Sequence, residues 1–312
     1  MTTPLLPPPL VRAEPLADGR RRWVGWYWSS NPLDPNPLDP WRTETAVPHL
    51  ADAMPCLWAD QTECGAITRV PAHFPAQTAP TARIVGPWYL APPGAPTQAG
   101  RKAQALQLLQ LVTADAETHA LEDVFRLDPA LTYQLLKLVN AAGTGSGRTV
   151  SSLSQAILLL GRQTLQRWLQ LMVFSARDDD PRCALLLPHV VLRARGMELL
   201  CLTLGGDRRA QEEAFVTGML SLLDVLFGQP AKEVLAPLAL APHLQLALTE
   251  GLGDLGGLLA LWKSMEEADF AGLTDRLANC ALDTTTFNHL LVQACHWVGQ
   301  TLPTPTSGGG RA

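Results

Sequence analysis

The sequence lacks several features that would place it in a membrane or a secretory pathway. No stretch reaches the about 18 uninterrupted apolar residues that a membrane-spanning helix needs. The first residues have no basic start and contain too many prolines for the apolar centre of a secretion signal. We therefore expect a cytoplasmic protein that does not enter a membrane.

Paired cysteine motifs are also absent. The six cysteines are scattered without CxxC spacing, and an even number indicates a disulfide framework only in small secreted chains. We expect these cysteines to be reduced and mostly buried.

Charge is sparse, because only 17% of the residues are charged, and the net charge of −5 is unevenly placed. Residues 176–312 hold ten basic and sixteen acidic side chains, whereas residues 101–175 hold seven and five. An acidic C-terminal half offers nucleic acid or an anionic membrane no general electrostatic attraction. We expect neither of them as a partner.

Composition changes at about residue 100. Residues 1–100 contain most of the prolines and six of the nine tryptophans. Proline fixes its own φ and keeps its neighbour out of the helical region, so long helices are excluded there. Two short stretches, residues 21–28 and 82–90, are typical of strands. We expect an irregular segment with a few short strands.

Residues 101–300 instead show helical periodicity. In the segment "DPALTYQLLKLVNAA", Asp128 is suited to cap a helix and Pro129 to its first position, and the apolar residues follow at spacings of three and four. The pattern predicts an all-α domain with roughly ten helices. The last residues, 301–312, are predicted to be a disordered tail.

Two glycine-rich stretches could be mistaken for phosphate-binding loops. "GLGDLG" at 251–256 satisfies the GxGxxG pattern, but a helical segment precedes it where a dinucleotide-binding unit needs a strand. "GTGSGR" at 143–148 lacks the Lys-Ser/Thr of a P-loop. We interpret the first as a turn between helices and the second as a helix end followed by a flexible connection.

Histidines and nucleophiles form no recognisable catalytic pattern. No two of the seven histidines are four residues apart, and no HD pair, HExxH or GxSxG is present. We therefore predict no metal and no cofactor. Arg148, Arg162 and Arg167 flank an apolar helix pair and could bind a phosphate-bearing ligand or an acidic partner. The alternative for these arginines is an ordinary solvated helix face.

The segment "LEDVFRLDPALTYQLLKLVNAAGTGSGRTVSSLSQAILLLGRQTLQRWLQLMVF", residues 121–174, closely resembles the HDOD domain of bacterial signalling proteins. The resemblance continues through residues 214–240 and 253–262, and it implies a multi-helix domain over residues 101–300. One departure is Ala141, where the family often has serine. The signature residues of the family are expected to be mainly structural here; they are Asp128, Pro129, Asn140 and Gly161.

HDOD domains are similar in fold to metal-dependent HD phosphohydrolases. Where those hydrolases carry "GLLHDIG", this sequence reads "GMLSLLD", so that Ser221 and Leu222 replace the His-Asp pair. His189 stands where the first metal-binding histidine would be. A hydroxyl and an alkyl side chain cannot hold a divalent cation or activate its water. The resemblance therefore implies a pseudoenzyme.

The beginning of the chain resembles another signalling domain. "EPLADGRRRWVGWYW" at 14–28 is similar to the opening strand of EAL domains, with Tyr27 in place of the metal-binding glutamate, and residues 83–93 are similar to the closing strand. A (β/α)₈ barrel usually takes about 250 residues. We therefore interpret residues 1–100 as a degenerate EAL remnant before the HDOD domain.

These resemblances favour a non-catalytic regulatory module in bacterial signal transduction that acts through protein contacts. One alternative is an HD-type metal-dependent phosphohydrolase. Another is a sensor that binds a nucleotide or small molecule without turnover.

Overall fold

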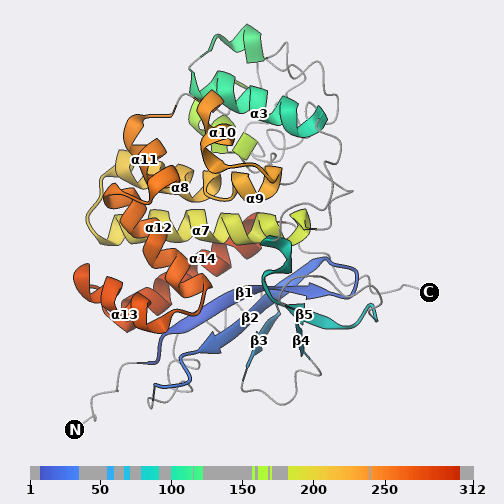
Figure 1. The fold of residues 1–312 in the computed structure, drawn as a ribbon, viewed down its shortest axis with the longest axis vertical. Helices are drawn as coiled ribbons and strands as arrows, with labels where there is room; N and C mark the ends of the chain where they lie inside the picture. The colour runs from blue at the N-terminus through green and yellow to red at the C-terminus, as the bar shows by residue number, and fades with distance from the viewer. Residues whose placement is uncertain are drawn as a thin grey trace, which may run out of the picture. The chain divides into compact units, whose positions relative to one another are not determined.

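A computed structural model gives the fold shown in Figure 1. It describes residues 8–34, 55–59, 67–70, 79–90, 100–114, 116–121, 157–158, 161–167, 169–170, 182–238 and 240–302. The chain forms two compact units. Unit 1 comprises residues 1–91, 181–222 and 246–312, and unit 2 comprises residues 92–180 and 223–245.

Unit 1 contains a five-stranded mixed sheet with the spatial order β3-β2-β1-β5-β4. The central strand β1 pairs antiparallel with β2 and β5, whereas the outer pairs, β2 with β3 and β4 with β5, are parallel. The strands are β1 (Val11–Asp18), β2 (Trp23–Ser30), β3 (Cys56–Trp58), β4 (Ile67–Arg69) and β5 (Arg83–Val85).

This sheet shows that the expected all-α fold class is wrong. The strand expected at residues 21–28 corresponds to β2, and the one expected at 82–90 is β5 followed by a 3-10 helix, but five strands from between residues 11 and 85 form one paired sheet. The alternation of side chains that reveals a strand cannot be recognised in the three residues of β3 or β4. The described part of residues 101–300 is helical, as expected.

Tryptophans form much of the sheet's core. Trp26 and Trp28, both on β2, are fully buried. Trp28 stacks on Trp58 of β3 with ring centroids 5.3 Å apart, and Trp23 meets Trp26 edge to face at 5.4 Å. Because such aromatic pairs bury large apolar areas, the stack of Trp28 on Trp58 holds the short strand β3 against β2.

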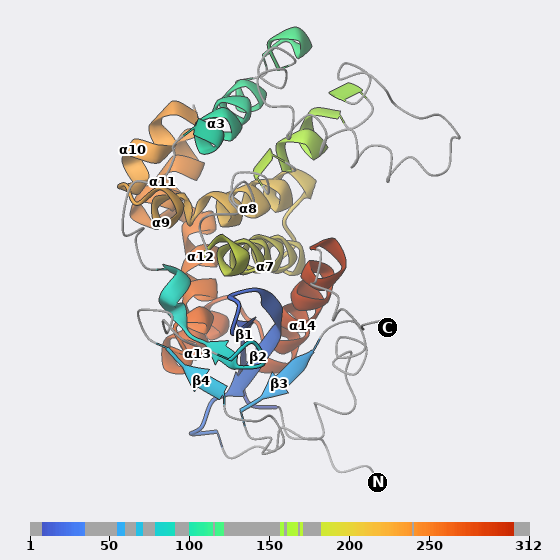
Figure 2. The ribbon, with the colours of Figure 1, turned by 90° about the vertical axis from the view of Figure 1, so that its right-hand side faces the viewer.

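Three helices of unit 1 pack on the sheet. Figures 1 and 2 show α7, α12 and α14 beside β1. The helices α8, α13 and α14 begin at aspartates whose carboxylates accept a backbone N–H, as N-caps do. The helices of unit 1 are α7 (Cys183–Thr203), α8 (Arg208–Leu220), α12 (Gly253–Glu266), α13 (Phe270–Asn279) and α14 (Thr284–Thr301), and η2 (Pro87–Leu90) is a short 3-10 helix.

One buried amide joins the two ends of unit 1. Asn288 of α14 is fully buried, its Oδ1 accepts the Val11 N–H at 3.2 Å, and its Nδ2 donates to the Pro9 carbonyl at 2.8 Å. These bonds pair the first backbone groups of β1 with a helix more than 270 residues later.

Unit 2 is helical where it is described. It contains α3 (Gly100–Thr113), α9 (Leu223–Phe227), α10 (Ala231–Leu235) and η3 (Ala236–Leu238), and α11 (Pro242–Glu250) begins in it and ends in unit 1. In the described part of the chain, no helix is long and apolar enough to cross a membrane. The proposed domain boundary at residue 100 stays a prediction.

Candidate functional site

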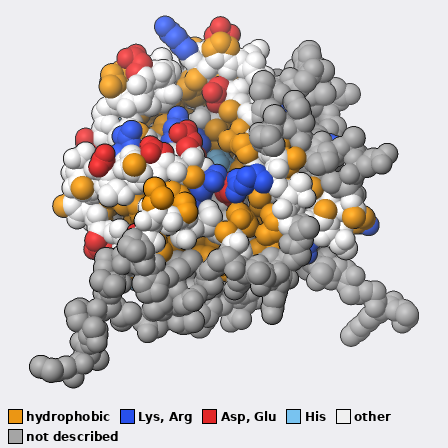
Figure 3. All heavy atoms as spheres, turned by 60° about the horizontal axis from the view of Figure 1, so that its bottom comes forward, with side chains coloured by type: hydrophobic (Ala, Val, Ile, Leu, Met, Phe, Trp, Pro, Cys, Tyr) orange, Lys and Arg blue, Asp and Glu red, His pale blue; other side chains and the backbone are white. Residues whose placement is uncertain are grey.

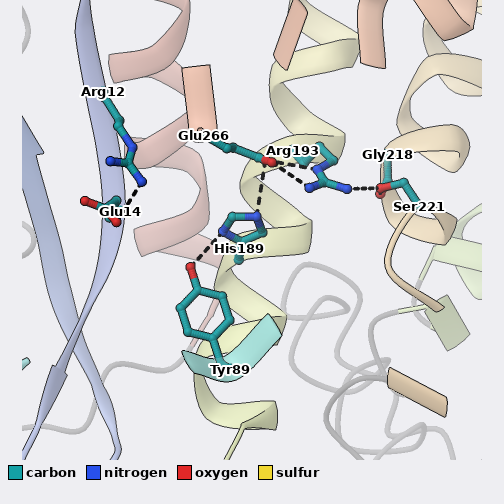
Figure 4. Close-up of polar contacts among 8 residues, drawn as sticks. All are labelled: Arg12, Glu14, Tyr89, His189, Arg193, Gly218, Ser221 and Glu266. Carbon is teal, nitrogen blue, oxygen red and sulfur yellow. Dashed lines mark hydrogen bonds and ion pairs between the residues drawn. The ribbon is translucent and has the colours of Figure 1, made fainter. Parts of the chain in front are cut away.

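A polar cluster lies inside unit 1, on the largely apolar helix α7. His189 and Arg193 are one turn apart on this helix and only 6% and 3% exposed. Burying a charged side chain is costly unless it is paired and hydrogen-bonded. Their partners therefore define the cluster, which Figure 4 shows in close-up.

Each nitrogen of the Arg193 guanidinium donates a charge-assisted hydrogen bond. Its Nε donates to Glu266 Oε1 at 2.9 Å and its Nη2 to Glu266 Oε2 at 2.5 Å, which is the bidentate arginine–carboxylate geometry. Its Nη1 donates to Ser221 Oγ at 2.7 Å. The Ser221 hydroxyl donates in turn to the Gly218 carbonyl, also at 2.7 Å, at the end of α8.

His189 lies between a phenol and the same carboxylate. Its Nδ1 is 3.0 Å from the Tyr89 hydroxyl of η2, and its Nε2 is 3.3 Å from Glu266 Oε1. Burial raises the pKa of Tyr89 far above its usual range, so this hydroxyl stays protonated. The Tyr89 hydroxyl is thus hydrogen-bonded to Nδ1, whereas Nε2 meets the carboxylate only at ion-pair distance.

Glu266 is the centre of charge in this cluster. Burial alone would raise the pKa of its carboxyl, but the positive charge of Arg193 and the contact with His189 outweigh burial and hold the pKa well below its usual range. Glu266 is therefore ionised at neutral pH, and both of its oxygens are engaged.

A second ion-pair group lies on the sheet. Glu14 of β1 contacts Arg12 at 2.8 Å and is held by Arg69 of β4 through bonds of 2.6 and 3.2 Å. The hydrogen bond to Glu14 raises the pKa of Arg69, whereas burial lowers the pKa of Arg12. The Arg69 guanidinium also lies 5.7 Å from the ring centroid of Tyr27 on β2, a cation–π distance.

Both groups are mutually paired ions. Among the described residues, no cluster of three or more His, Cys, Asp or Glu side chains has the arrangement of a metal site. On the face drawn in Figure 3, basic side chains gather next to acidic and hydrophobic ones, so that face presents no field of one sign. What the cluster does is join α7, α8, α12 and η2 through directional bonds.

Comparison with known proteins identifies the domain that contains α7 and α8. The profile described as HDOD domain matches residues 102–233. The chain therefore carries an HDOD domain. Within the cluster, His189, Arg193 and Ser221 lie inside the matched HDOD region, whereas Tyr89 and Glu266 lie outside it.

Two curated relatives are similar to part of the chain. The chain is 30% identical over 195 residues to "Cyclic di-GMP phosphodiesterase CdgJ" of Vibrio cholerae. The aligned residues cover 62% of this chain and 44% of that protein. It is 29% identical over 142 residues to "Uncharacterized protein YuxH" of Bacillus subtilis, covering 45% and 34%. The chain thus spans less than half the length of these curated relatives.

A solved structure is also similar. It is the MmoQ response regulator from Methylococcus capsulatus, with 21% sequence identity and a TM-score of 0.30, and the match covers 63% of this chain and 97% of that one. The HDOD domain and the relative CdgJ together support a role in signal transduction.

The HDOD residues singled out from the sequence fall in different places. Gly161 has a φ of +72°, the left-handed conformation that favours glycine. Arg162 and Arg167 lie on the helical turns of residues 161–167, where Arg162 donates a hydrogen bond to the Ala116 carbonyl. The other four, Arg148, Asp128, Pro129 and Asn140, lie outside the described residues. A ligand-binding role for the three arginines stays a prediction.

Sequence reasoning found only part of the cluster. It singled out Ser221 and His189 and missed Arg193, although an arginine one turn after a histidine within an apolar helix signals buried polar partners. Glu266 is 73 residues from Arg193, and no local pattern pairs them.

Proposed function

We propose that this chain is a non-catalytic signal-transduction module that acts through contacts with other proteins. The HDOD domain and the similarity to CdgJ support the signalling role. The observation that carries the non-catalytic part is the bonding of Arg193 with Glu266 and Ser221.

The contacts of Arg193 oppose metal binding at this site. In the resemblance to HD hydrolases, Ser221 stands at the position of the metal-binding histidine. Here the guanidinium donates to that serine and to both oxygens of a buried carboxylate. A permanent cation thus holds these groups, and it would repel a divalent cation at bonding distance. Leu222, at the position of the metal-binding aspartate, offers no ligand.

We further propose that the sheet is a degenerate EAL domain. Two observations support this proposal: the sequence of β1 and β2 is similar to the opening of EAL domains, and Tyr27 occupies a position of interest in that similarity. That residue stands at the position of the metal-binding glutamate and lies next to Arg69, which is engaged by Glu14. The sheet then serves as a structural platform for α7, α12 and α14.

The alternative function is hydrolysis of cyclic dinucleotides, which the similarity to the cyclic di-GMP phosphodiesterase CdgJ favours. The test is a turnover assay on the purified full chain with cyclic dinucleotides and added Mn²⁺ or Mg²⁺, together with elemental analysis for bound transition metal. We expect background turnover and no stoichiometric metal. Turnover that His189→Ala abolishes, while His119→Ala at an exposed site leaves it intact, would establish the hydrolase instead.

A further inference from the structure

Three leucines are exposed at one end of unit 1. Leu202 and Leu204, at the end of α7, are 53% and 42% exposed, and Leu252, between α11 and α12, is 53% exposed. Single exposed leucines are ordinary on protein surfaces, but several close together mark an interaction site.

The packing of α7 against α12 brings these leucines to the same end. Arg193 of α7 is hydrogen-bonded to Glu266, the last residue of α12. Further along α7, a Cβ at Gly196 would meet the ring of Trp262, which comes earlier in α12. Residues further along α7 therefore meet residues earlier in α12, so that the two helices run antiparallel. The end of α7 and the start of α12 consequently lie together at the left in Figure 1.

Charge effects around Cys201 support this placement. Burial is the main reason that the pKa of this thiol is raised, and the carboxylates of Asp207 and Asp254 raise it further. Asp207 follows Leu204 and Asp254 follows Leu252 in the sequence. The two segments that carry the exposed leucines are therefore close to one thiol.

Glycines keep the surface around these leucines open. Gly205, Gly251 and Gly253 have positive φ values, and Gly257 lies on the exposed side of α12. Within the described part of the chain, no atom lies within 4 Å of the place that a Cβ would take at any of the four. The backbone of another segment could therefore approach closely.

The surface is also negative. Helices α7 and α11 end here while α8 and α12 begin here, so the partial charges of these helix ends offset one another and the negative charge comes from carboxylates. The carboxylates of Asp207, Glu250 and Asp254 are exposed nearby. The arginines that open α8, Arg208 and Arg209, are each paired with a glutamate one turn later.

We propose that this surface docks a basic amphipathic segment of a partner protein, with the leucines packing on its apolar side and the carboxylates contacting its lysines or arginines. The leucine patch consists of Leu202, Leu204 and Leu252 with Asp207, Glu250 and Asp254 around them. This inference rests on the proposed function, since it names the chemistry of the partner that a non-catalytic module would bind.

The probe is a fluorescent 14-residue peptide of leucine and lysine at helical spacing, titrated into the full chain and followed by fluorescence anisotropy. A peptide with glutamate in place of lysine is the control ligand. We expect saturable binding of the lysine peptide that weakens as salt is raised. The double variant L202S/L252S should weaken it at least about tenfold, as loss of central apolar contacts does.

Two further variants sharpen the test. D254N removes one charge around the patch and should weaken binding by a few fold, about what one rim charge contributes. L33S changes a leucine that is 89% exposed elsewhere on unit 1 and should leave binding unchanged. All of these substitutions are at exposed positions, and circular dichroism melts check that each variant is folded.

Several results would overturn the docking proposal. The first is absence of binding of the lysine peptide up to about 1 mM, a range typical of the weakest specific contacts. The second is that the glutamate peptide binds as tightly as the lysine peptide. The third is that L202S/L252S binds the lysine peptide as tightly as the unmodified chain does. Dimerisation in sedimentation velocity that the double variant abolishes would assign the patch to a second copy of the chain. None of these results bears on the turnover assay, so the docking surface and the non-catalytic function fail separately.

Discussion

The close contact between α7 and α8 predicts that adding one methyl group at Gly218 destabilises the protein. A Cβ at Gly218 of α8 would lie 2.4 Å from the Cα and 2.8 Å from the N of Ala194 on α7. Both neighbours are backbone atoms, which no side-chain rotation can move away. Gly218→Ala must therefore push the two helices apart, and with them the Ser221 hydroxyl that Arg193 contacts.

The expected cost follows from two opposing effects. Overpacking a well-packed contact costs about 1–3 kcal/mol, and a clash with backbone belongs at the upper end. Replacing glycine by alanine inside a helix returns about 1 kcal/mol through helix propensity. Gly218→Ala should therefore lower the free energy of unfolding by about 2 kcal/mol, the difference of these two effects.

Gly257 of α12 provides the matched control. Its position is exposed, and no described atom lies within 4 Å of the place of a Cβ. The same substitution there gains helix propensity without a clash, so Gly257→Ala should stabilise the protein by about 0.5–1 kcal/mol. Urea denaturation followed by circular dichroism measures both. Equal stability changes of the same sign at the two glycines would refute the close contact of α7 and α8.

Two more predictions concern buried polar groups. The pKa of Glu266 is lowered in the folded state, so its contribution to stability is complete above the ordinary glutamate pKa of about 4.3 and is lost as pH falls below it. Urea midpoints measured between pH 7 and pH 3.5 should therefore fall less steeply for Glu266→Gln than for the unmodified chain; parallel curves would contradict the pairing with Arg193. Asn288→Ala should lower the free energy of unfolding by about 2–4 kcal/mol because it leaves two backbone groups buried without partners. Asn279→Ala, at the exposed end of α13, should change it by less than about 0.5 kcal/mol. Similar losses at both positions would refute the role of Asn288.

The sequence allowed the helical domain to be predicted, because its signals are local. Helical spacing of apolar residues and the HDOD signature are contained within short stretches. The family match at residues 102–233 confirms that an HDOD domain is present, whereas its expected extent over residues 101–300 stays a prediction. Turn chemistry was equally local: Gly251 and Gly253 adopt positive φ between α11 and α12, where a turn between helices was expected.

Long-range pairing could not be predicted in the same way. The strands β3 and β4 are too short to show alternation, and their partners are selected by tryptophan packing and by ion pairs such as that of Arg69 with Glu14, 55 residues apart. The buried cluster has the same origin. Its two halves, Arg193 and Glu266, meet only because α7 and α12 pack together, and nothing in the sequence near Arg193 indicates that its partner is Glu266.

The bonds of Asn288 to the start of β1 have a consequence for how the protein is made. A ribosome exposes Asn288 only 277 residues after Val11, so β1 must wait for its helix while those residues are synthesised. Unit 2, by contrast, draws all of its residues from between positions 92 and 245. Pairings so distant in sequence are slow to form, and waiting strands expose apolar surface and unpaired backbone. We therefore expect chaperones to bind the tryptophan-rich segment of the nascent chain until α14 has been synthesised.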